Sequence, residues 1–221
     1  MTALLTAIYG GYDSPKPLRH HTGFSEAVCV TDDPGLRIEG WRMVHEPNTL
    51  GVHPRRAAKR ARCLPWDYVT DDTVMWLDGS FIIDNGACAI VDRHLERGDI
   101  VAWRHPSGRR DAFAEAEFSA PLRKYRDEPT LEQAAAYREE GLPPGSGLWE
   151  TGMMARRRTP LIEQLGRMWL DEIERWSVQD QVSFPFVCWQ LGVEPVCWDT
   201  GTSHWDCGWA WYQRHADESW P

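Results

Sequence analysis

Several features that would mark a metal-ribbon, secreted or membrane protein are missing from this sequence. No pair of cysteines has CxxC or zinc-ribbon spacing, and a chain of 221 residues does not need disulfides to fold. No stretch approaches the roughly 18 consecutive apolar residues of a membrane span, and the N-terminal MTALLTAIYGGYD has no basic leader. We therefore expect reduced cysteines, a cytoplasmic location, no membrane span, and a first strand rather than a signal peptide.

An excess of positive charge is also missing. The chain has 24 Lys and Arg against 33 Asp and Glu, a formal charge of -9, which argues against nonspecific coating of nucleic acid or acidic membrane but leaves room for local basic patches. There is no internal repeat and no low-complexity tract. With 42% hydrophobic and 26% charged residues, the composition predicts a globular fold, and the length predicts one domain over residues 1–221.

Tryptophan, in contrast, is abundant. The chain has 13, of which six gather near the C-terminus: Trp189, Trp198, Trp205, Trp209, Trp211 and Trp220. One interpretation is packing in the core and under a lid, since tryptophan is mostly buried. The other is a platform that stacks on sugar rings or bases. We expect the Trp-rich segment 198–221 to pack on the functional site or to cover it.

Strand-like and helix-like segments alternate along the chain, which predicts an α/β fold with a central, mostly parallel sheet flanked by helices. The predicted strands are 3–9, 27–30, 41–44, 74–77, 100–103 and one within 148–158. Two helices are predicted to begin at Pro54 and Ala87. A third is predicted to be capped by Thr130, and a fourth by Thr159 and Pro160. The last helix is expected to bury Leu161, Leu165, Met168, Trp169 and Trp176, and 141–147 (GLPPGSG) is the clearest loop, a candidate boundary or mobile cover.

Three polar motifs are expected at one edge of this sheet, because ligands of open parallel sheets bind beyond the carboxyl ends of the strands. They are GGYD, TDD with Asp32, and DGS. Gly10 and Gly11 would let the backbone approach a ligand, Tyr12 could stack on a base, and Asp13 could accept a hydrogen bond from a ribose or a uracil-like edge. A tight turn explains GGYD equally well.

Asp78 follows the apolar run VMWL, so its carboxylate is expected at the tip of a buried strand. One interpretation is a turn or a cap, because Asp beside Gly is common in turns. The other is a ligand for Mn²⁺ or Mg²⁺, which prefer oxygen donors and bridge the phosphates of nucleotides, with Gly79 and Ser80 beside it.

A basic run lies on the helix that begins at Pro54, with Arg55, Lys59 and Arg62 on one helical face. Such a run is often just a solvated face. In an acidic chain it is also a candidate well for a diphosphate.

Two later motifs are also ambiguous. Asp180 could cap a helix, or Asp180 and Gln181 could project into the site to position an acceptor or steady positive charge on a sugar. His204 could be structural, or it could complete a metal shell begun by Asp78.

Together these stretches resemble the glycosyltransferase-like domain family that includes plant enzymes implicated in pectin and mucilage synthesis and many bacterial relatives. The matching pieces, in order, are TAIYGGYD, VTDD, PRRAAKRAR, MWLDGS, VAWRHPSGRRDAFAEAE, ETGMMARRR and WSVQDQVSFPF. The resemblance implies a GT-A-like, Rossmann-like domain in which Asp78 stands for the metal-binding acid of a DxD motif. Ser80 occupies the position of the second acid of that motif. It further implies that His105, Arg109 and Glu150 are polar groups on the acceptor side and that Asp180 and Gln181 form the acceptor-side pair, which we expect to be catalytic.

The resulting hypothesis is a metal-dependent transferase that moves a sugar from a nucleoside diphosphate, most simply a UDP-sugar, to a hydroxyl. The acceptor would be a glycan or glycoconjugate, or a flipped-out hydroxymethylated base in DNA held by the Arg-rich segments 104–110 and 156–158. Acceptor binding that weakens strongly with added salt would favour DNA. The alternative from another class is a noncatalytic carbohydrate- or nucleotide-binding protein.

Overall fold

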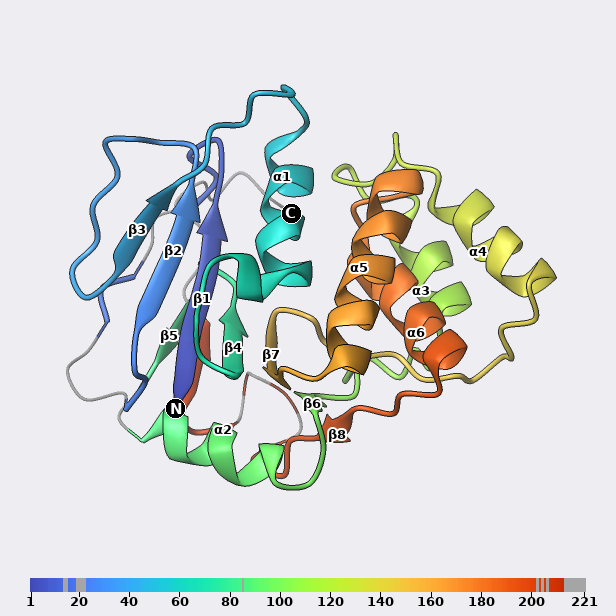
Figure 1. The fold of residues 1–221 in the computed structure, drawn as a ribbon. Helices are drawn as coiled ribbons and strands as arrows, with labels where there is room; N and C mark the ends of the chain where they lie inside the picture. The colour runs from blue at the N-terminus through green and yellow to red at the C-terminus, as the bar shows by residue number, and fades with distance from the viewer. Residues whose placement is uncertain are drawn as a thin grey trace.

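The computed structural model describes residues 1–13, 16–18, 23–84, 86–201, 203, 205 and 207–212. Its centre is a seven-stranded sheet of order β3-β2-β1-β4-β7-β6-β8 (Figure 1). Only β7 runs antiparallel to its neighbours β4 and β6, so the sheet is mostly parallel, as predicted. The strands are β1 Thr2–Ile8, β2 Ala27–Thr31, β3 Arg42–His45, β4 Thr73–Leu77, β6 Ile100–Ala102, β7 Met153–Arg157 and β8 Val196–Cys197.

Helices cover both faces of this sheet, and a second, two-stranded sheet pairs β5 (Phe81–Ile83) with β9 (Ala210–Tyr212). None of the helices in the described part of the chain is long and apolar enough to cross a membrane. The six cysteines, which all lie in the described part of the chain, form no disulfide. The helices are α1 Pro54–Cys63, the short 3-10 helix η1 Pro65–Asp67, α2 Ala87–Leu95, α3 Ala112–Ser119, α4 Thr130–Glu139, α5 Pro160–Arg175 and α6 Asp180–Leu191.

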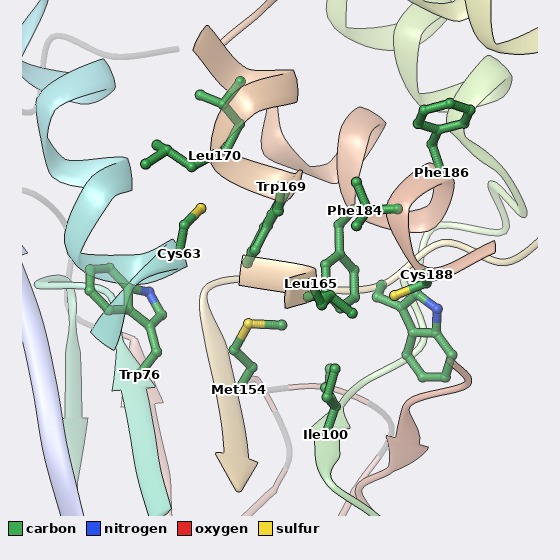
Figure 2. Close-up of a cluster of buried hydrophobic side chains, with 14 of the residues drawn as sticks. Cys63, Trp76, Ile100, Met154, Leu165, Trp169, Leu170, Phe184, Phe186 and Cys188 are labelled. Atoms are coloured by element: carbon green, nitrogen blue, oxygen red, sulfur yellow. The ribbon is translucent and has the colours of Figure 1, made fainter. Parts of the chain in front are cut away.

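The two faces of the sheet are covered differently because successive side chains of a strand point to opposite faces. On β4, Trp76 joins the core that contains α1, α5 and α6, whereas Met75 and Leu77 join the core of α2 and the small sheet. In Figure 2, Trp76 of β4 lies beside Cys63 of α1, and Met154 and Ile100 of the strands lie next to Trp169 and Leu165 of α5. Near-continuous burial of strands such as β2 follows from this double cover.

Most predicted elements are present within one or two residues of their expected ends, with two corrections. The buried face of α5 is formed by Ile162, Leu165, Trp169 and Ile173, whereas Leu161 is 43% exposed. Thr159 does cap α5, since its side chain accepts a hydrogen bond from the backbone of Ile162 at 3.3 Å. Thr130, in contrast, is the first residue of α4 and not its cap.

The C-terminal end of α1 is clamped from two sides. From β7, Arg156 donates hydrogen bonds to the backbone oxygens of Arg62 and Cys63, the second at 3.4 Å. Arg156 is fully buried, so it does not contribute to an exposed basic patch over 156–158. Burial lowers its pKa to about 10, which leaves it charged at neutral pH, opposite the negative end of the helix dipole. From α5, Gly166 faces Cys63, and a Cβ there would lie 2.2 Å from the Cys63 oxygen.

This contact predicts that Gly166→Ala destabilises the protein. In a helix free of contacts the same change would stabilise by roughly 0.5–1 kcal/mol, because alanine is the better helix former. Here the added methyl group must push α5 away from α1, at a cost of about 1–3 kcal/mol. The free energy of unfolding, measured in urea, gives the sign directly. The control is Gln164→Ala, a change of an exposed residue on the same helix, whose free energy of unfolding should stay within about 0.5 kcal/mol of the parent's. A Gly166→Ala protein as stable as the parent would contradict the close contact of Gly166 with the end of α1.

Candidate active site

A cavity of about 430 Å³ opens beyond the carboxyl ends of β1 and β4. One wall is formed by a face of α1, and two of the acids in the lining, Asp78 and Asp180, come from the turn after β4 and the start of α6. Most of the site residues predicted from the sequence line it: Tyr12, Asp13, Arg55, Lys59, Arg62, Asp78, Gly79, Ser80, His105, Glu150, Asp180 and Gln181. The topology therefore brings together residues that are up to 169 positions apart, between Tyr12 and Gln181.

The remaining predicted residues lie outside this lining or outside the described part of the chain. Asp32 accepts a hydrogen bond from the backbone of Gly10 at 2.9 Å. Gly10 has φ 62°, and a Cβ there would lie 2.6 Å from Pro54, so this glycine lets β1 approach α1 closely. Gly11 is exposed beside it, with φ 63°. His204, the second predicted metal ligand, falls outside the described residues.

Arg109 supports the site from behind its lining. Its Nε donates to Glu115 at 2.6 Å, and its Nη2 lies 3.3 Å from Nε2 of His105, which does line the cavity. The side chain packs against the ring of Phe118, with 3.8 Å from Cζ to the centroid. Arg109 therefore contacts a residue of the lining without lining the cavity itself.

The centre of the cavity is a cluster of two acids and two cations. Asp180 accepts hydrogen bonds from Lys59 at 2.7 Å, from the hydroxyl of Thr151 at 3.2 Å and from Arg62. The other end of the Arg62 guanidinium binds Asp78, whose Oδ1 also accepts from the indole of Trp76 at 2.8 Å. Arg62 thus connects the strand that carries Asp78 to the helix that carries Asp180.

This cluster decides between the interpretations of Asp180. The residue that caps α6 is Gln179, and its side chain makes no capping bond, so Asp180 does not serve as the cap. The Asp180 carboxylate instead points into the cation cluster. Gln181 lines the cavity and donates to the backbone oxygen of Trp149 at 3.1 Å.

The basic run on α1 also divides as the helical spacing predicts. Arg55, Lys59 and Arg62 line the cavity. Arg56 instead binds Glu128 at 3.0 Å, and Arg60 binds Asp67 at 2.6 Å. One face of α1 therefore serves the cavity, and the others are tied to neighbouring segments.

Burial and ion pairing shift the pKa values of the cluster in opposite directions. Burial lowers the pKa of Lys59, and the positive charge of the neighbouring Arg62 lowers it further. The Asp180 carboxylate raises it but only partly offsets these effects, so the pKa is about 8. Burial alone would raise the pKa of Asp180, but Arg62 and Lys59 outweigh it and lower the value to about 2. Asp180 is consequently ionised at neutral pH, whereas Lys59 loses its proton near pH 8.

Asp78 offers one free oxygen to a cation. Its Oδ1 is occupied by Arg62 and Trp76, whereas no hydrogen bond to Oδ2 is present among the described residues. A Cβ at Gly152 would lie 3.1 Å from Oδ2, so the glycine keeps this side of the carboxylate open. Over the described ranges, no group of three or more His, Cys, Asp or Glu is arranged to hold a metal ion. The described residues therefore fit a metal through one carboxylate oxygen and do not form a complete shell.

Several lining residues were not predicted from the sequence, among them Thr151, Lys124, Tyr125 and Gln179, whereas Trp205 and Tyr212 lie in the segment 198–221 that was expected to pack on the site. Thr151 and Gln179 adjoin predicted residues, so their neighbours were a usable signal. Lys124 and Tyr125 lie between α3 and α4 in a stretch without periodic pattern, and α3 itself was not predicted, so nothing in the sequence pointed to them.

The tryptophans of the C-terminal part divide between packing and the cavity. Trp198 and Trp209 are buried against Trp103, with ring centroids 5.5 and 5.8 Å away. Trp205 is 64% exposed and lines the cavity together with Tyr212, with 4.8 Å between their ring centroids. That the whole segment 198–221 covers the site remains a prediction.

The ion cluster predicts a large loss of stability for Asp180→Asn. Removing one partner of a buried ion pair leaves uncompensated charge, at a cost of about 3–5 kcal/mol. Because the pKa of Asp180 is lowered, its pairs stabilise the fold above about pH 4 and are lost as the pH falls toward 2. The difference in free energy of unfolding between parent and variant, measured in urea, should therefore shrink over that window.

Asp67→Asn is the matched control, since it breaks an ion pair of α1 whose side chains are about half exposed. It should cost less than about 1 kcal/mol. Equal losses for the two variants at pH 7 would show that the Asp180 cluster contributes no more than a surface pair.

Comparison with known proteins relates this chain to one protein family. The model of the TOD1/MUCI70 glycosyltransferase-like domain matches residues 19–199. No curated protein matches the chain. Among solved structures, the apo WbbM bifunctional glycosyltransferase gives a TM-score of 0.51 at 13% identity, over 90% of this chain and 38% of that one, which shows a shared fold.

Two further solved structures overlap with the chain at lower scores. Galactosyltransferase LgtC in complex with donor and acceptor sugar analogs has a TM-score of 0.48 and 14% identity, covering 89% of this chain and 72% of that one. Apo mouse xyloside xylosyltransferase 1 has a TM-score of 0.45 and 10% identity, covering 89% of this chain and 83% of that one. The fold is GT-A-like, and since the family model spans well over half of the residues, the chain belongs to the TOD1/MUCI70 family of glycosyltransferase-like domains.

Proposed function

We propose that this protein is a glycosyltransferase that moves a sugar from a nucleoside diphosphate, most simply a UDP-sugar, to a hydroxyl of a glycan or small glycoconjugate. The observation that supports this most directly is the cavity at the carboxyl edge of the sheet. In it, Asp78 at a strand tip lies opposite a cationic face of α1. A donor with an anionic leaving group and a neutral sugar needs this combination of charges.

The nucleoside would lie at the end of β1. Tyr12 and Asp13 line the cavity there, and Asp13 is buried. In this proposal the Tyr12 ring stacks on the base, and Asp13 accepts a hydrogen bond from the ribose or the base edge. Asp32 acts indirectly, because its carboxylate holds the backbone of Gly10.

The diphosphate would lie between Asp78 and α1. A Mn²⁺ or Mg²⁺ ion bound by Asp78, with His204 as a further ligand, would supply positive charge to the leaving diphosphate. Independently of that ion, Arg62 and Lys59 are fixed cations, since Asp180 holds both in place before any ligand arrives. Fixed charges of this kind stabilise a developing anion without reorganisation.

Asp180 and Gln181 would act on the sugar side. A carboxylate whose pKa is near 2 is a poor proton acceptor at neutral pH. Asp180 therefore orients the two cations and places negative charge near the sugar. The Gln181 amide is oriented by its bond to the Trp149 oxygen, so its own oxygen can accept a hydrogen bond from a sugar hydroxyl. His105 and Glu150 would meet the acceptor.

Asp78→Asn should abolish most of the slow hydrolysis of the donor that transferases carry out without acceptor. The change removes the carboxylate proposed to hold the ion, and a loss of at least about 100-fold is expected. The assay incubates the protein with a panel of nucleotide sugars and Mn²⁺ and quantifies released nucleotide. EDTA should reduce the parent's rate similarly and should leave the variant's rate unchanged.

Asp127→Asn, which changes a carboxylate that is 92% exposed, is the control and should hydrolyse the donor at the parent's rate. Full activity of the parent in EDTA would contradict the metal part of the proposal only. Absence of hydrolysis across the panel, together with normal ligand binding by Asp78→Asn, would favour a noncatalytic binding protein instead.

Affinity for UDP should fall as the pH rises through about 8, because Lys59 loses its positive charge there. Lys59→Arg keeps a charge at all these pH values and should remove the decline. Calorimetric titration between pH 7 and 9 measures both proteins. A parent whose affinity stays constant over this range would show that Lys59 does not contact the phosphates.

A further inference from the structure

Two cations at the mouth of the cavity have no acidic partner. Arg55 and Lys124 both line the cavity, and within the described ranges neither forms an ion pair, whereas Lys59 and Arg62 deeper in the same wall are both paired with acids. Arg55 lies seven residues before Arg62 on α1, about 10 Å along the helix axis. The charge on this helix face is therefore balanced at the floor of the cavity and unbalanced at its mouth.

Both cations lie near the same aromatic ring. Arg55 Cζ lies 4.6 Å and Lys124 Nζ 4.9 Å from the centroid of the Tyr125 ring. Arg55 also donates to the backbone oxygen of Lys124 at 2.8 Å, which joins the start of α1 to the α3–α4 connection. Partial burial and the nearby guanidinium lower the pKa of Lys124, as expected when like charges are brought together.

A buried network fixes the ring beneath them. Tyr125 is buried, and its hydroxyl donates to the Gln179 side-chain oxygen at 2.9 Å. The amide nitrogen of Gln179 donates in turn to Glu115 at 2.7 Å and to Ser119 at 3.0 Å. Each of these four side chains is satisfied inside the protein, so the ring is held rigidly and its position does not depend on a ligand.

We infer that Arg55 and Lys124 form a binding site for an anionic group, a phosphate or a carboxylate, at the mouth of the cavity. Two cations without a counterion repel each other, and an anion placed between them relieves that repulsion and accepts hydrogen bonds from both. This inference rests on the proposed function for its ligands. The anion is either the diphosphate of the donor or the carboxylate of an acidic acceptor sugar.

Calorimetric titration of the full chain at low salt distinguishes the two sources. The donor arm uses UDP and inorganic pyrophosphate, and the acceptor arm compares D-glucuronate with neutral D-glucose. Arg55→Gln and Lys124→Gln should each weaken binding of the relevant anion about tenfold, because each removes a hydrogen bond between charged groups. Lys124→Arg should retain most of the affinity.

Arg123→Gln is the matched control, since it removes one exposed positive charge next to Lys124 and outside the cavity lining. It should bind as the parent does, and thermal melts of all variants exclude unfolding as the cause of lost binding. Weakening confined to UDP and pyrophosphate supports the site and assigns it to the donor. Weakening confined to glucuronate supports it and assigns it to an acidic acceptor.

The inference is overturned if Arg55→Gln and Lys124→Gln bind every probe as tightly as Arg123→Gln does. It is also overturned if the parent binds neither pyrophosphate nor UDP and binds glucuronate no better than glucose. Donor hydrolysis that depends on Asp78 is a separate measurement, so the anion site can fail while the proposed transferase activity stands.

Discussion

The arrangement of the cavity depends on the ion pairs that the Asp180 carboxylate makes with two cations of α1. This carboxylate lies at the start of α6 and holds Lys59 and Arg62 of α1, and Arg62 reaches on to Asp78 at the end of β4. Three separate elements are thereby fixed relative to one another around the space that a ligand would fill. An ion pair this buried is tolerated because each charge has a partner and further hydrogen bonds from Thr151 and Trp76.

The two ends of helix α1 present differently paired charges to the cavity. Its C-terminal end is clamped by Arg156 and Gly166, so the side chain of Arg62 starts from a fixed backbone. Its N-terminal end packs against Gly10 and carries Arg55 to the mouth. Along one face, positive charge is consequently neutralised at the floor and left for a ligand at the opening.

The polar cluster rests on the apolar one beneath it. Trp76 packs in the core shared with α5 and α6 (Figure 2). Its indole nitrogen donates to the Asp78 carboxylate at 2.8 Å. Trp169 packs in the same core and donates to the backbone oxygen of Asp180 at 3.2 Å. Asp78 and Asp180, the two acids of the central cluster, are therefore positioned by tryptophans that are themselves immobilised by packing.

The order of strands and helices, the position of Asp78 at a strand tip and the cavity-facing side of α1 were all accessible from the sequence, because they follow from local periodicity of 2 and 3.6 residues. The same reasoning misplaced the buried face of α5 at Leu161 and missed α3, whose Asp111 cap was the available signal. Local sequence patterns do not predict contacts between residues of distant segments. Lys124 and Tyr125 reach the cavity only because α3 and α4 pack on α6.

The sequence by itself determined which residue types could serve the site and at which edge of the sheet they would meet. Only the tertiary structure decided which charges neutralise one another, because Arg62 and Asp180 are 118 positions apart and their pairing is set by the packing of α1 against α5 and of α5 against α6. It also decided that Arg156 is buried against the end of α1 and that Arg55 and Lys124 form no ion pair with any residue that the structure describes. Charge pairing depends on distances between elements, and those distances are fixed by the core.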